Sequence, residues 1–270
     1  MSTATHTPRR KLVNLRNFPL FNPVSLFVML FLYLPLIYVV IYSFNSSRIG
    51  SVWKGFSVKW YHTALNNTDM QRALKNSLQV GFAATILSTV LSVMAALGLL
   101  RMKRAGKAIA MALIGAPLII AEIVLAVGTL GLFIAVGVPL GKVALIIAHT
   151  AFCIPFALLP IRAALSQLDV APFEAAADLG ANERDILRYI TLPLLAPAIV
   201  AGALLAFAIS IDDFIMSFFV AGPGATTLPV YIFGMIRSTV TPEVNAISTL
   251  LLLFSGLVLI GSYVIQRKRR

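Results

Sequence analysis

Long runs of hydrophobic residues, separated by short polar stretches, dominate the chain from about residue 24 to its end. Six of these runs reach the roughly 20 apolar residues that a helix needs to cross the hydrocarbon core of a bilayer. They cover residues of about 24–44, 78–100, 108–135, 143–162, 194–220 and 246–266. Only helices satisfy their own backbone polar groups in lipid over such lengths. The pattern therefore predicts an all-α integral membrane protein with six transmembrane helices.

The composition supports this interpretation. Hydrophobic residues make up 59% of the chain and charged residues 12%, and the mean hydropathy is +0.91, which lies outside the range of soluble domains. The chain has one cysteine, Cys153, so no intrachain disulfide can form. Residues 1–23 contain no small-residue cleavage site before the first run. We expect them to remain as a tail on one transmembrane domain, residues 24–266.

The net charge of +12 is distributed unevenly along the chain. Most of the 22 Lys and Arg residues lie in the tail 1–23, in the connection after the second run, in the segment 166–193 and in the basic tail 267–270. Loops rich in Lys and Arg stay in the cytoplasm, so both termini and the segment 166–193 are expected there. Basic residues beside span ends meet anionic lipid headgroups, so the charge does not indicate nucleic-acid binding.

The segment 166–193 is a polar interruption between the fourth and fifth runs. Its centre reads Glu174-Ala175-Ala176-Ala177-Asp178-Leu179-Gly180. Alanine favours helix and leaves little side-chain bulk, so the surface of another protein could approach the backbone closely. Gly180 can end a first helix in the left-handed conformation, and Asn182 can cap a second helix. We predict two short helices, the second closed by Leu192-Pro193, that form a cytoplasmic docking element.

The spacing in this segment resembles a known signature. Glu174-Ala175-Ala176, three residues, Gly180, nine residues, Ile190, one residue and Leu192-Pro193 is similar to the cytoplasmic loop of the membrane subunits of bacterial ABC importers. The resemblance implies a type I ABC importer permease fold, in which the loop forms a coupling helix against the ATP-hydrolysing subunit. The residues expected to make this contact are Glu174, Ala175, Ala176, Asp178, Leu179 and Gly180.

Three carboxylates fall inside the predicted spans. Glu122 is near the middle of the third span, and Asp212 and Asp213 lie toward the outer part of the fifth. A charge near the bilayer centre costs at least about 2.5–3.5 kcal/mol, so each acid needs a partner, water or a function. No Lys or Arg lies inside a span, since Arg162 is the last residue of the fourth, and His149 is the only other group there that is expected to ionise near neutral pH. We therefore predict a path for a cation, lined by Glu122, Asp212, Asp213, Phe214 and Phe218.

The two adjacent acids are expected to have different roles. Helical spacing puts Gly202, Ala206, Ser210, Asp213 and Ser217 on one small, polar face. Asp212 lies about 100° away around the helix, so one acid could line the path while the other bonds within the protein. Two alternatives remain open: an aspartate could pair with an Arg of a partner subunit, and Glu122 could be protonated and hydrogen-bonded. His149 is expected to be a hydrogen-bonded core residue, and Trp53, Trp60 and Tyr61 to be anchors at the membrane interface.

Other stretches resemble the polyamine branch of these permeases. They are Ser43-Phe44-Asn45-Ser46-Ser47, Asn76-Ser77-Leu78, Ser210-Ile211-Asp212-Asp213, the run from Gly222 to Pro229 and the run from Thr241 to Ala246. The run from Gly222 to Pro229 favours the putrescine type over the spermidine type. The resemblance implies an importer in the bacterial inner membrane that contains this chain, a second homologous permease, two ATPase subunits and a periplasmic polyamine-binding protein.

Energy would come from the ATPase partner, which binds ATP and Mg²⁺. The sequence contains no phosphate-binding GxxxxGK[ST] motif, and Gly137 to Val143 is one residue short of it and lacks the hydroxyl. We expect no cofactor, metal or catalytic residue on this chain itself. One alternative is a secondary transporter or channel for an organic cation that works alone. A membrane-embedded enzyme is a weaker one, because no Ser/His/Asp or HExxH arrangement is present.

Overall fold

The computed structural model describes residues 21–47, 52–238 and 242–267. The helices are α1 (Phe21–Ser43), α2 (Lys59–Asn66), α3 (Thr68–Arg101), α4 (Arg104–Ile119), α5 (Glu122–Val136), α6 (Lys142–Leu165), α7 (Ala171–Asp178), α8 (Glu183–Asp185), the π-helical turn η2 (Ile186–Thr191), α9 (Leu192–Asp212), α10 (Ile215–Val220), α11 (Leu228–Ser238) and α12 (Pro242–Arg267). Within the described ranges there is no strand, only an isolated bridge between Asn45 and Phe56. The predicted all-α class is confirmed.

Four helices are long and apolar enough to cross a membrane. They are Pro23–Ser43, Thr68–Arg101, Lys142–Leu165 and Glu183–Asp212. A fifth span requires α4 and α5 together, which are bent by 111°. The part of α12 whose side chains are described, Pro242–Leu257, is shorter than a full span. A total of six spans therefore stays a prediction.

The third span is not the continuous helix that the sequence predicted. Pro117 removes a backbone donor in the last turn of α4, and Ile120 and Ala121 are extended before α5 begins. Hydrophobicity is continuous across this bend, so the run 108–135 gave no sign of it. The consequence is that Glu122 starts a helix instead of lying inside one.

The fifth span also differs from the prediction at both of its ends. Leu192-Pro193 does not close the preceding helix, because the chain from Glu183 to Asp212 is helical throughout. The turn η2 widens to the π geometry just before Pro193, and the Leu192 N–H bonds to the Leu187 oxygen five residues earlier. Such a turn accommodates a proline that cannot donate within a regular α-helix. At the other end, the predicted run to residue 220 is interrupted after Asp212.

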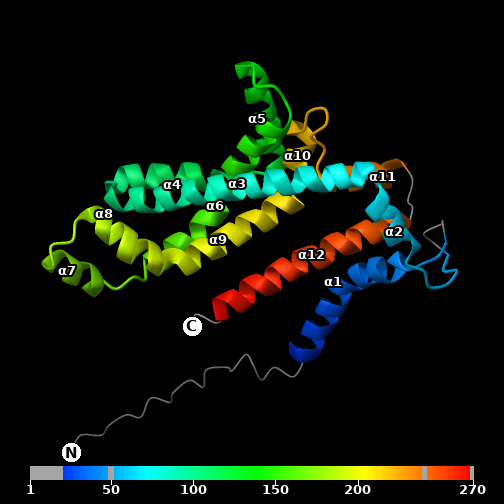
Figure 1. Cartoon of the computed structure of the whole chain (residues 1–270), viewed down its shortest axis with the longest axis horizontal. Helices are drawn as coiled ribbons and strands as arrows, with labels where there is room; N and C mark the ends of the chain where they lie inside the picture. Colours follow the sequence, from blue (N-terminus) through cyan, green and yellow to red (C-terminus); the bar gives the residue numbers. More distant parts are fainter. Residues whose placement is uncertain (1–20, 48–51, 239–241, 268–270) are drawn as a thin grey trace, which may run out of the picture.

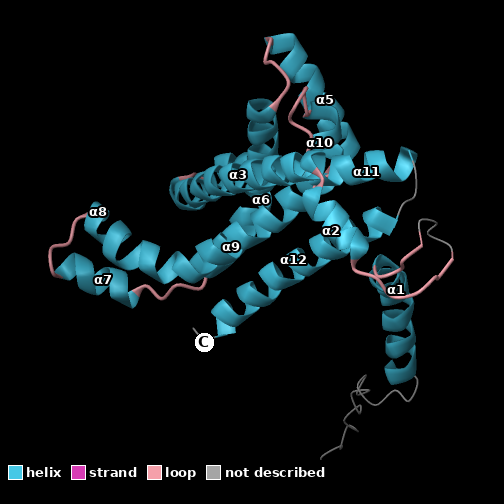
Figure 2. Ribbon diagram, turned by 45° about the vertical axis from the view of Figure 1, so that its right-hand side comes forward, coloured by secondary structure: helices cyan, strands magenta, loops and turns pink. Residues whose placement is uncertain are grey.

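The centre of the fold is a bundle in which α3, α6 and α9 pack against one another (Figure 1). Small residues line the buried stripe of α3, and the Ser92 hydroxyl donates to the Ile154 oxygen of α6 at 2.9 Å. Small and hydroxyl side chains allow this close approach of helices. α1 contacts α12 and lies away from the central bundle (Figure 2). None of the apolar window of α1 is buried within the chain.

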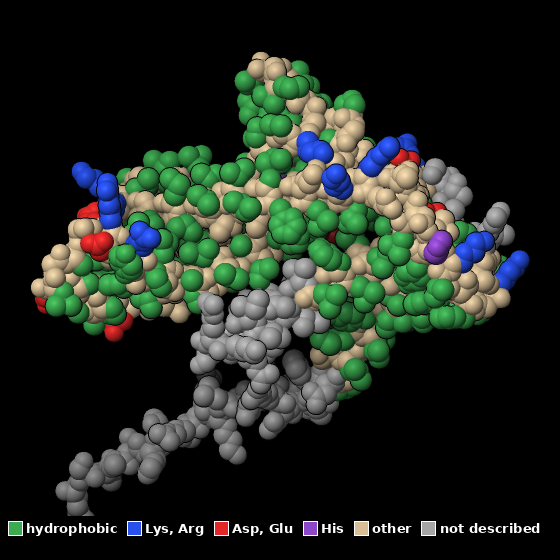
Figure 3. Space-filling model, viewed as in Figure 1, with side chains coloured by type: hydrophobic (Ala, Val, Ile, Leu, Met, Phe, Trp, Pro, Cys, Tyr) green, Lys and Arg blue, Asp and Glu red, His purple; other side chains and the backbone are tan. Residues whose placement is uncertain are grey.

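The described residues between α1 and α3 include a short helix, α2, and side chains that pack within the protein. Trp60 lies on α2, is 8% exposed and donates from Nε1 to the Asn45 oxygen at 2.8 Å. The expectation that Trp60 is a membrane-interface anchor is therefore wrong, because its polar group is satisfied inside the protein. Trp53 remains exposed. In Figure 3, charged side chains gather near α7 and α8 at one end and near α2 and α11 at the other, with a hydrophobic surface between them.

Candidate substrate path and docking surface

The fifth predicted span breaks at Asp213, where the chain leaves the helical conformation. α9 ends at Asp212, Asp213 is extended with φ −65° and ψ 121°, and α10 begins at Ile215. The Asp213 carboxylate accepts backbone N–H groups of the next helix, from Met216 at 3.3 Å and from Ser217 at 2.9 Å. The first N–H groups of a helix have no partner inside it and favour a negative acceptor. Asp213 thus stabilises the start of α10.

His149 of α6 completes the environment of this carboxylate. Its Nε2 lies 3.2 Å from Asp213 Oδ2 and 3.1 Å from Ser217 Oγ, and its Nδ1 lies 2.8 Å from Ser210 Oγ. The Ser217 hydroxyl donates to the same carboxylate oxygen at 3.0 Å. Both His149 and Asp213 are buried, and a buried acid is tolerated when it is paired and hydrogen-bonded. The prediction that His149 is a hydrogen-bonded core residue is confirmed.

Glu122 reaches the same cluster from the other helix break. It is the first residue of α5, and its carboxyl is close enough to that of Asp213 for the two to interact electrostatically. The expected position near the middle of a continuous span is wrong, because the chain turns at Ile120 and Ala121. α5 packs against α10, so the two broken spans meet at their breaks. The sequence carried no signal for this meeting.

Below the cluster, small residues bring α6 and α9 into close contact. The Cys153 thiol lies 3.5 Å from the Ala206 oxygen, one helical turn from the Ser210 contact. One turn further, a Cβ on Gly202 would lie 2.6 Å from the Ala157 oxygen. These contacts recur every four residues on both helices, as packed neighbouring turns do. The residues predicted to share a small, polar face are all buried: Gly202, Ala206, Ser210, Asp213 and Ser217.

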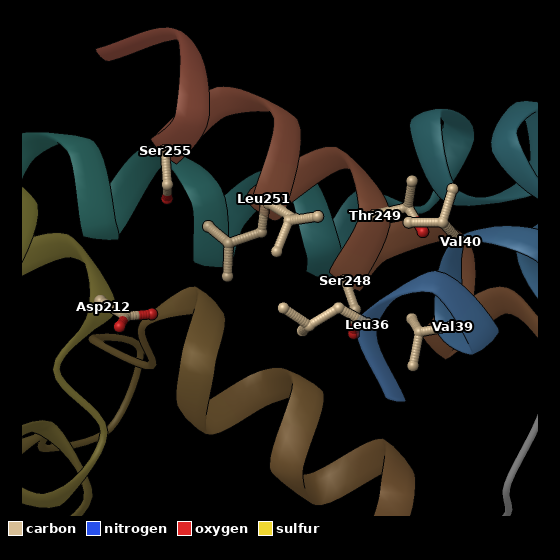
Figure 4. Close-up of a pocket in the computed structure, with 9 residues that line it drawn as sticks. Leu36, Val39, Val40, Asp212, Ser248, Thr249, Leu251 and Ser255 are labelled. Carbon is tan, nitrogen blue, oxygen red and sulfur yellow. The ribbon is translucent and has the colours of Figure 1, made fainter. Parts of the chain in front are cut away.

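Asp212 has a different environment from its neighbour. It is exposed and lines a cavity of about 310 Å³ between α1, α12 and the end of α9 (Figure 4). The other lining residues are Leu36, Val39, Val40, Ser248, Thr249, Leu251, Leu252 and Ser255. Among the described residues, Asp212 has no hydrogen-bond or ion-pair partner. A carboxylate beside hydroxyl groups and aliphatic walls suits an ammonium group attached to a methylene chain.

Three aromatic rings form a cluster beside the break. The Phe214 ring centroid lies 4.7 Å from that of Phe233 and 5.4 Å from that of Phe218. Phe218 and Phe233 are 47% and 39% exposed, so their ring faces are accessible. Phe233 belongs to α11, and sequence reasoning missed it because only folding brings it to Phe214. Accessible aromatic faces near a carboxylate can attract a cation.

The predicted docking segment lies at one end of the molecule, beyond α6 and before α9 (Figure 1). α7 ends at Asp178, Gly180 has a left-handed φ of +79°, and α8 follows. The Asn182 side chain accepts the N–H groups of Arg184 at 2.9 Å and Asp185 at 3.0 Å, which caps the start of α8. The first helix, the turn at Gly180 and the start of the second helix lie where the sequence predicted, but the second helix is not short, because it continues through Pro193 into α9.

The side chains expected to contact a partner are mostly at the surface. Glu174, Ala175, Asp178, Leu179 and Gly180 are exposed, whereas Ala176 is half-buried. Leu179 is 89% exposed, although an apolar side chain of this size gains free energy when it leaves water. Because Ala176 is half-buried within the chain, it exposes less surface to a partner than the other five residues do. Within the described ranges, no group of three or more His, Cys, Asp or Glu residues could hold a metal ion.

Curated relatives align with nearly the whole chain. The spermidine/putrescine transport system permease protein PotC of Escherichia coli K12 is 39% identical over 239 residues, which cover 88% of this chain and 90% of that protein. PotC of Haemophilus influenzae is 40% identical over 92% of this chain and 96% of its own length. The putrescine transport system permease protein PotI of Escherichia coli K12 is 39% identical over 89% of this chain and 88% of that protein.

Solved structures show the same fold at lower identity. A chain of a bacterial ABC transporter involved in the import of alginate superposes with a TM-score of 0.71 and 15% identity, and the match covers 91% of this chain and 93% of that one. Residues 88–270 match the family model described as the binding-protein-dependent transport system inner membrane component. That match spans more than half of the sequence, and the chain therefore belongs to the family of inner membrane components of binding-protein-dependent transport systems.

Proposed function

We propose that this chain is a permease subunit of an ATP-driven importer of polyamines, with putrescine as the first substrate to test. The observation that carries the proposal is the alignment with relatives named as spermidine/putrescine and putrescine permeases over 88% to 92% of the chain. The chemistry of the described residues supports a cationic substrate. Three acids lie near the point where two broken spans meet: Asp213 is buried, Glu122 is half-buried, and Asp212 is exposed and unpaired among the described residues.

The substrate path includes Glu122, Asp212, Asp213, Phe214 and Phe218. Asp212 is the acid available to an ammonium group, because its carboxylate opens into a cavity and has no partner among the described residues. Phe214 and Phe218, which follow Asp212 in the chain, form a ring pair whose faces can attract a cation. Asp213 is already bound by His149 and is therefore not available to the substrate. Together with Glu122, it contributes negative potential near Asp212.

The segment 166–193 couples the path to ATP hydrolysis. The segment from Glu183 to Asp212 is one continuous helix, about 45 Å long at 1.5 Å per residue. Its start is tied to α3 by the ion pair between Arg101 and Glu183 at 2.7 Å. A displacement of α7 and α8 by an ATPase would therefore move the far end of the same helix, where Asp212 lies. This motion would alternate access to the path between the two sides of the membrane.

The proposed assembly contains a second homologous permease, two ATPase subunits that bind ATP and Mg²⁺, and a periplasmic polyamine-binding protein. A periplasmic partner is consistent with the related alginate transporter, whose structure is described as a complex with a pentasaccharide-bound periplasmic protein. We place six spans in the bacterial inner membrane, with both termini and the segment 166–193 in the cytoplasm. Glu174, Ala175, Asp178, Leu179 and Gly180 face the ATPase, and Ala176 supports them.

Uptake of labelled putrescine by the assembled importer tests the assignment of Asp212. Asp212→Asn keeps the size of the side chain and removes its charge, so we expect KM for putrescine to rise about tenfold, the equivalent of about 1.4 kcal/mol. Asp69→Asn is the matched control, because Asp69 is an exposed acid paired with Arg72 at 3.5 Å and lies outside the path. Equal uptake kinetics for Asp212→Asn and the parent protein would remove the role of Asp212. Competition by spermidine and by neutral amino acids would define the substrate class.

A further inference from the structure

His149 touches both sides of the break between α9 and α10. Its Nδ1 lies 2.8 Å from the Ser210 hydroxyl in the last turn of α9, and its Nε2 lies 3.1 Å from the Ser217 hydroxyl in α10. The same Nε2 lies 3.2 Å from the carboxylate of Asp213, the extended residue between the two helices. One imidazole, 1% exposed, therefore joins three elements at the point where the span changes direction.

The neighbouring acid depends on this arrangement. Without the imidazole, the Asp213 carboxylate would keep only the donors of α10, the N–H groups of Met216 and Ser217 and the Ser217 hydroxyl. A buried carboxylate that loses its partner from α6 is less well compensated there, so we expect Asp213 to shift from its position. The preceding residue, Asp212, lines the cavity between α1, α12 and the end of α9. The two residues share a peptide bond at the end of α9, so a backbone rotation that moved Asp213 would also change the direction of the Asp212 side chain.

We propose that His149 is a positioning residue of the path: by holding Asp213 in the break, it directs the Asp212 side chain into the cavity between α1 and α12. The consequence for putrescine uptake rests on the proposed function. The consequence for the direction of residue 212 does not, because it follows from contacts within the chain. The two parts can therefore fail independently.

Two substitutions distinguish the role of Nδ1 from the role of Nε2 in the His149 imidazole. The amide of His149→Asn can reach only the Nδ1 position, which contacts Ser210, whereas the longer His149→Gln can place an amide N–H at the Nε2 position, which contacts Asp213. If His149 merely packs α6 on α9, both variants should behave alike or Asn should suffice. If it holds Asp213, Gln should restore the parent behaviour and Asn should not.

The measurement is the reaction of a cysteine at position 212 with a small cationic thiol reagent. Asp212→Cys is introduced with Cys153→Ala, which removes the only native cysteine, and the assembled importer is labelled in membrane vesicles. We expect His149→Asn and His149→Leu to change the labelling rate at least about fivefold, and His149→Gln to stay within about twofold of the parent. Thr150→Val is the matched control, because Thr150 is a buried neighbour that bonds only to the Ile146 oxygen.

Labelling rates within about twofold of the parent in both His149→Asn and His149→Leu would overturn the proposal. If these two variants do not accumulate in the membrane, Ser217→Ala and Ser210→Ala decide, since Ser217 donates to Asp213 and Ser210 does not. A change in labelling with Ser217→Ala alone supports the proposal, and equal rates for the two serine variants contradict it. With Asp212 intact, His149→Asn should also raise KM for putrescine more than it lowers the maximal rate. Unchanged kinetics there, with altered labelling, would count against the substrate role of Asp212 and not against the positioning role of His149.

Discussion

Asp212 and Asp213 are adjacent in the chain but differ in every property that decides function. Asp213 is buried, bound by His149 and used to stabilise the start of α10. Asp212 is exposed in a cavity and has no partner among the described residues. The helical angle between neighbours predicted that the two acids would differ. Which acid was bound could not be predicted, because His149 is 64 positions from Asp213 and only the packing of α6 on α9 brings them together.

Gly202 is the residue on which that packing depends most directly. A Cβ at this position would lie 2.6 Å from the Ala157 oxygen, a distance that forces the backbones of α6 and α9 apart. We expect Gly202→Ala to destabilise the purified complex by about 1–3 kcal/mol, although alanine is the better helix former. The measurement is the thermal unfolding midpoint in detergent.

Gly115→Ala provides the control for that experiment. Gly115 lies in α4 with nothing within 4 Å of its Cβ position, so the same substitution there should leave the midpoint unchanged or raise it slightly. Opposite signs for the two variants are the expected result. Equal midpoints would mean that α6 and α9 can move apart without loss, and the close contact would not be structurally important.

At the scale of elements, the sequence predicted which segments are helical better than where those helices bend. Hydrophobicity reports which residues avoid water, and its average over a span stays high across Ile120 and Ala121 and across the Asp212-Asp213 pair. Each bend needs only one or two extended residues, which do not disturb an average taken over 20 positions. A carboxylate that caps the next helix, as Asp213 does, is satisfied by N–H groups that hydropathy does not register.

The conformation at the centre of the predicted docking segment could be predicted because its signals are local. Gly180 takes the left-handed conformation and Asn182 caps the following helix, and both roles depend on residues only a few positions away. By contrast, the π-helical turn before Pro193 was not anticipated. A proline usually ends a helix, and widening of the preceding turn is a rarer accommodation.

Leu179 gives the docking segment its sharpest test. The side chain is 89% exposed at the end of α7, where a partner surface would cover it. Buried apolar anchors at protein interfaces are often worth about 2 kcal/mol or more, so we expect Leu179→Ser to lower ATP-driven uptake at least about tenfold while membrane insertion is unchanged. Leu65→Ser is the control, because Leu65 is a leucine on α2, 57% exposed and outside the docking segment. Similar losses in both variants would argue against a specific contact at Leu179.

At the scale of the whole molecule, the apolar surface of α1 lies outside the packing of the chain itself. The apolar window of α1 is not buried at all within the chain, and the cavity at Asp212 is bounded only by α1, α12 and the end of α9. α1 must therefore be covered by lipid or by a second subunit, and the proposed path would receive only part of its lining from this chain. Sequence reasoning anticipated a second permease from the family resemblance, not from these surfaces.

Reconstitution with and without partners tests this view against a transporter that works alone. Vesicles that contain only this chain should take up no more putrescine than empty vesicles under a proton or sodium gradient. In the proposed importer, ATP hydrolysis by the partner subunits moves α7 and α9, and an ion gradient does not. Vesicles with the second permease and the ATPase subunits should take up putrescine when ATP and the periplasmic binding protein are supplied, and should stop when ATP is withdrawn. Gradient-driven uptake by the isolated chain would favour the stand-alone carrier, since the acids at the helix breaks could then serve as its coupling site. A purely passive leak of putrescine through the isolated chain, insensitive to both gradients and ATP, would favour a channel.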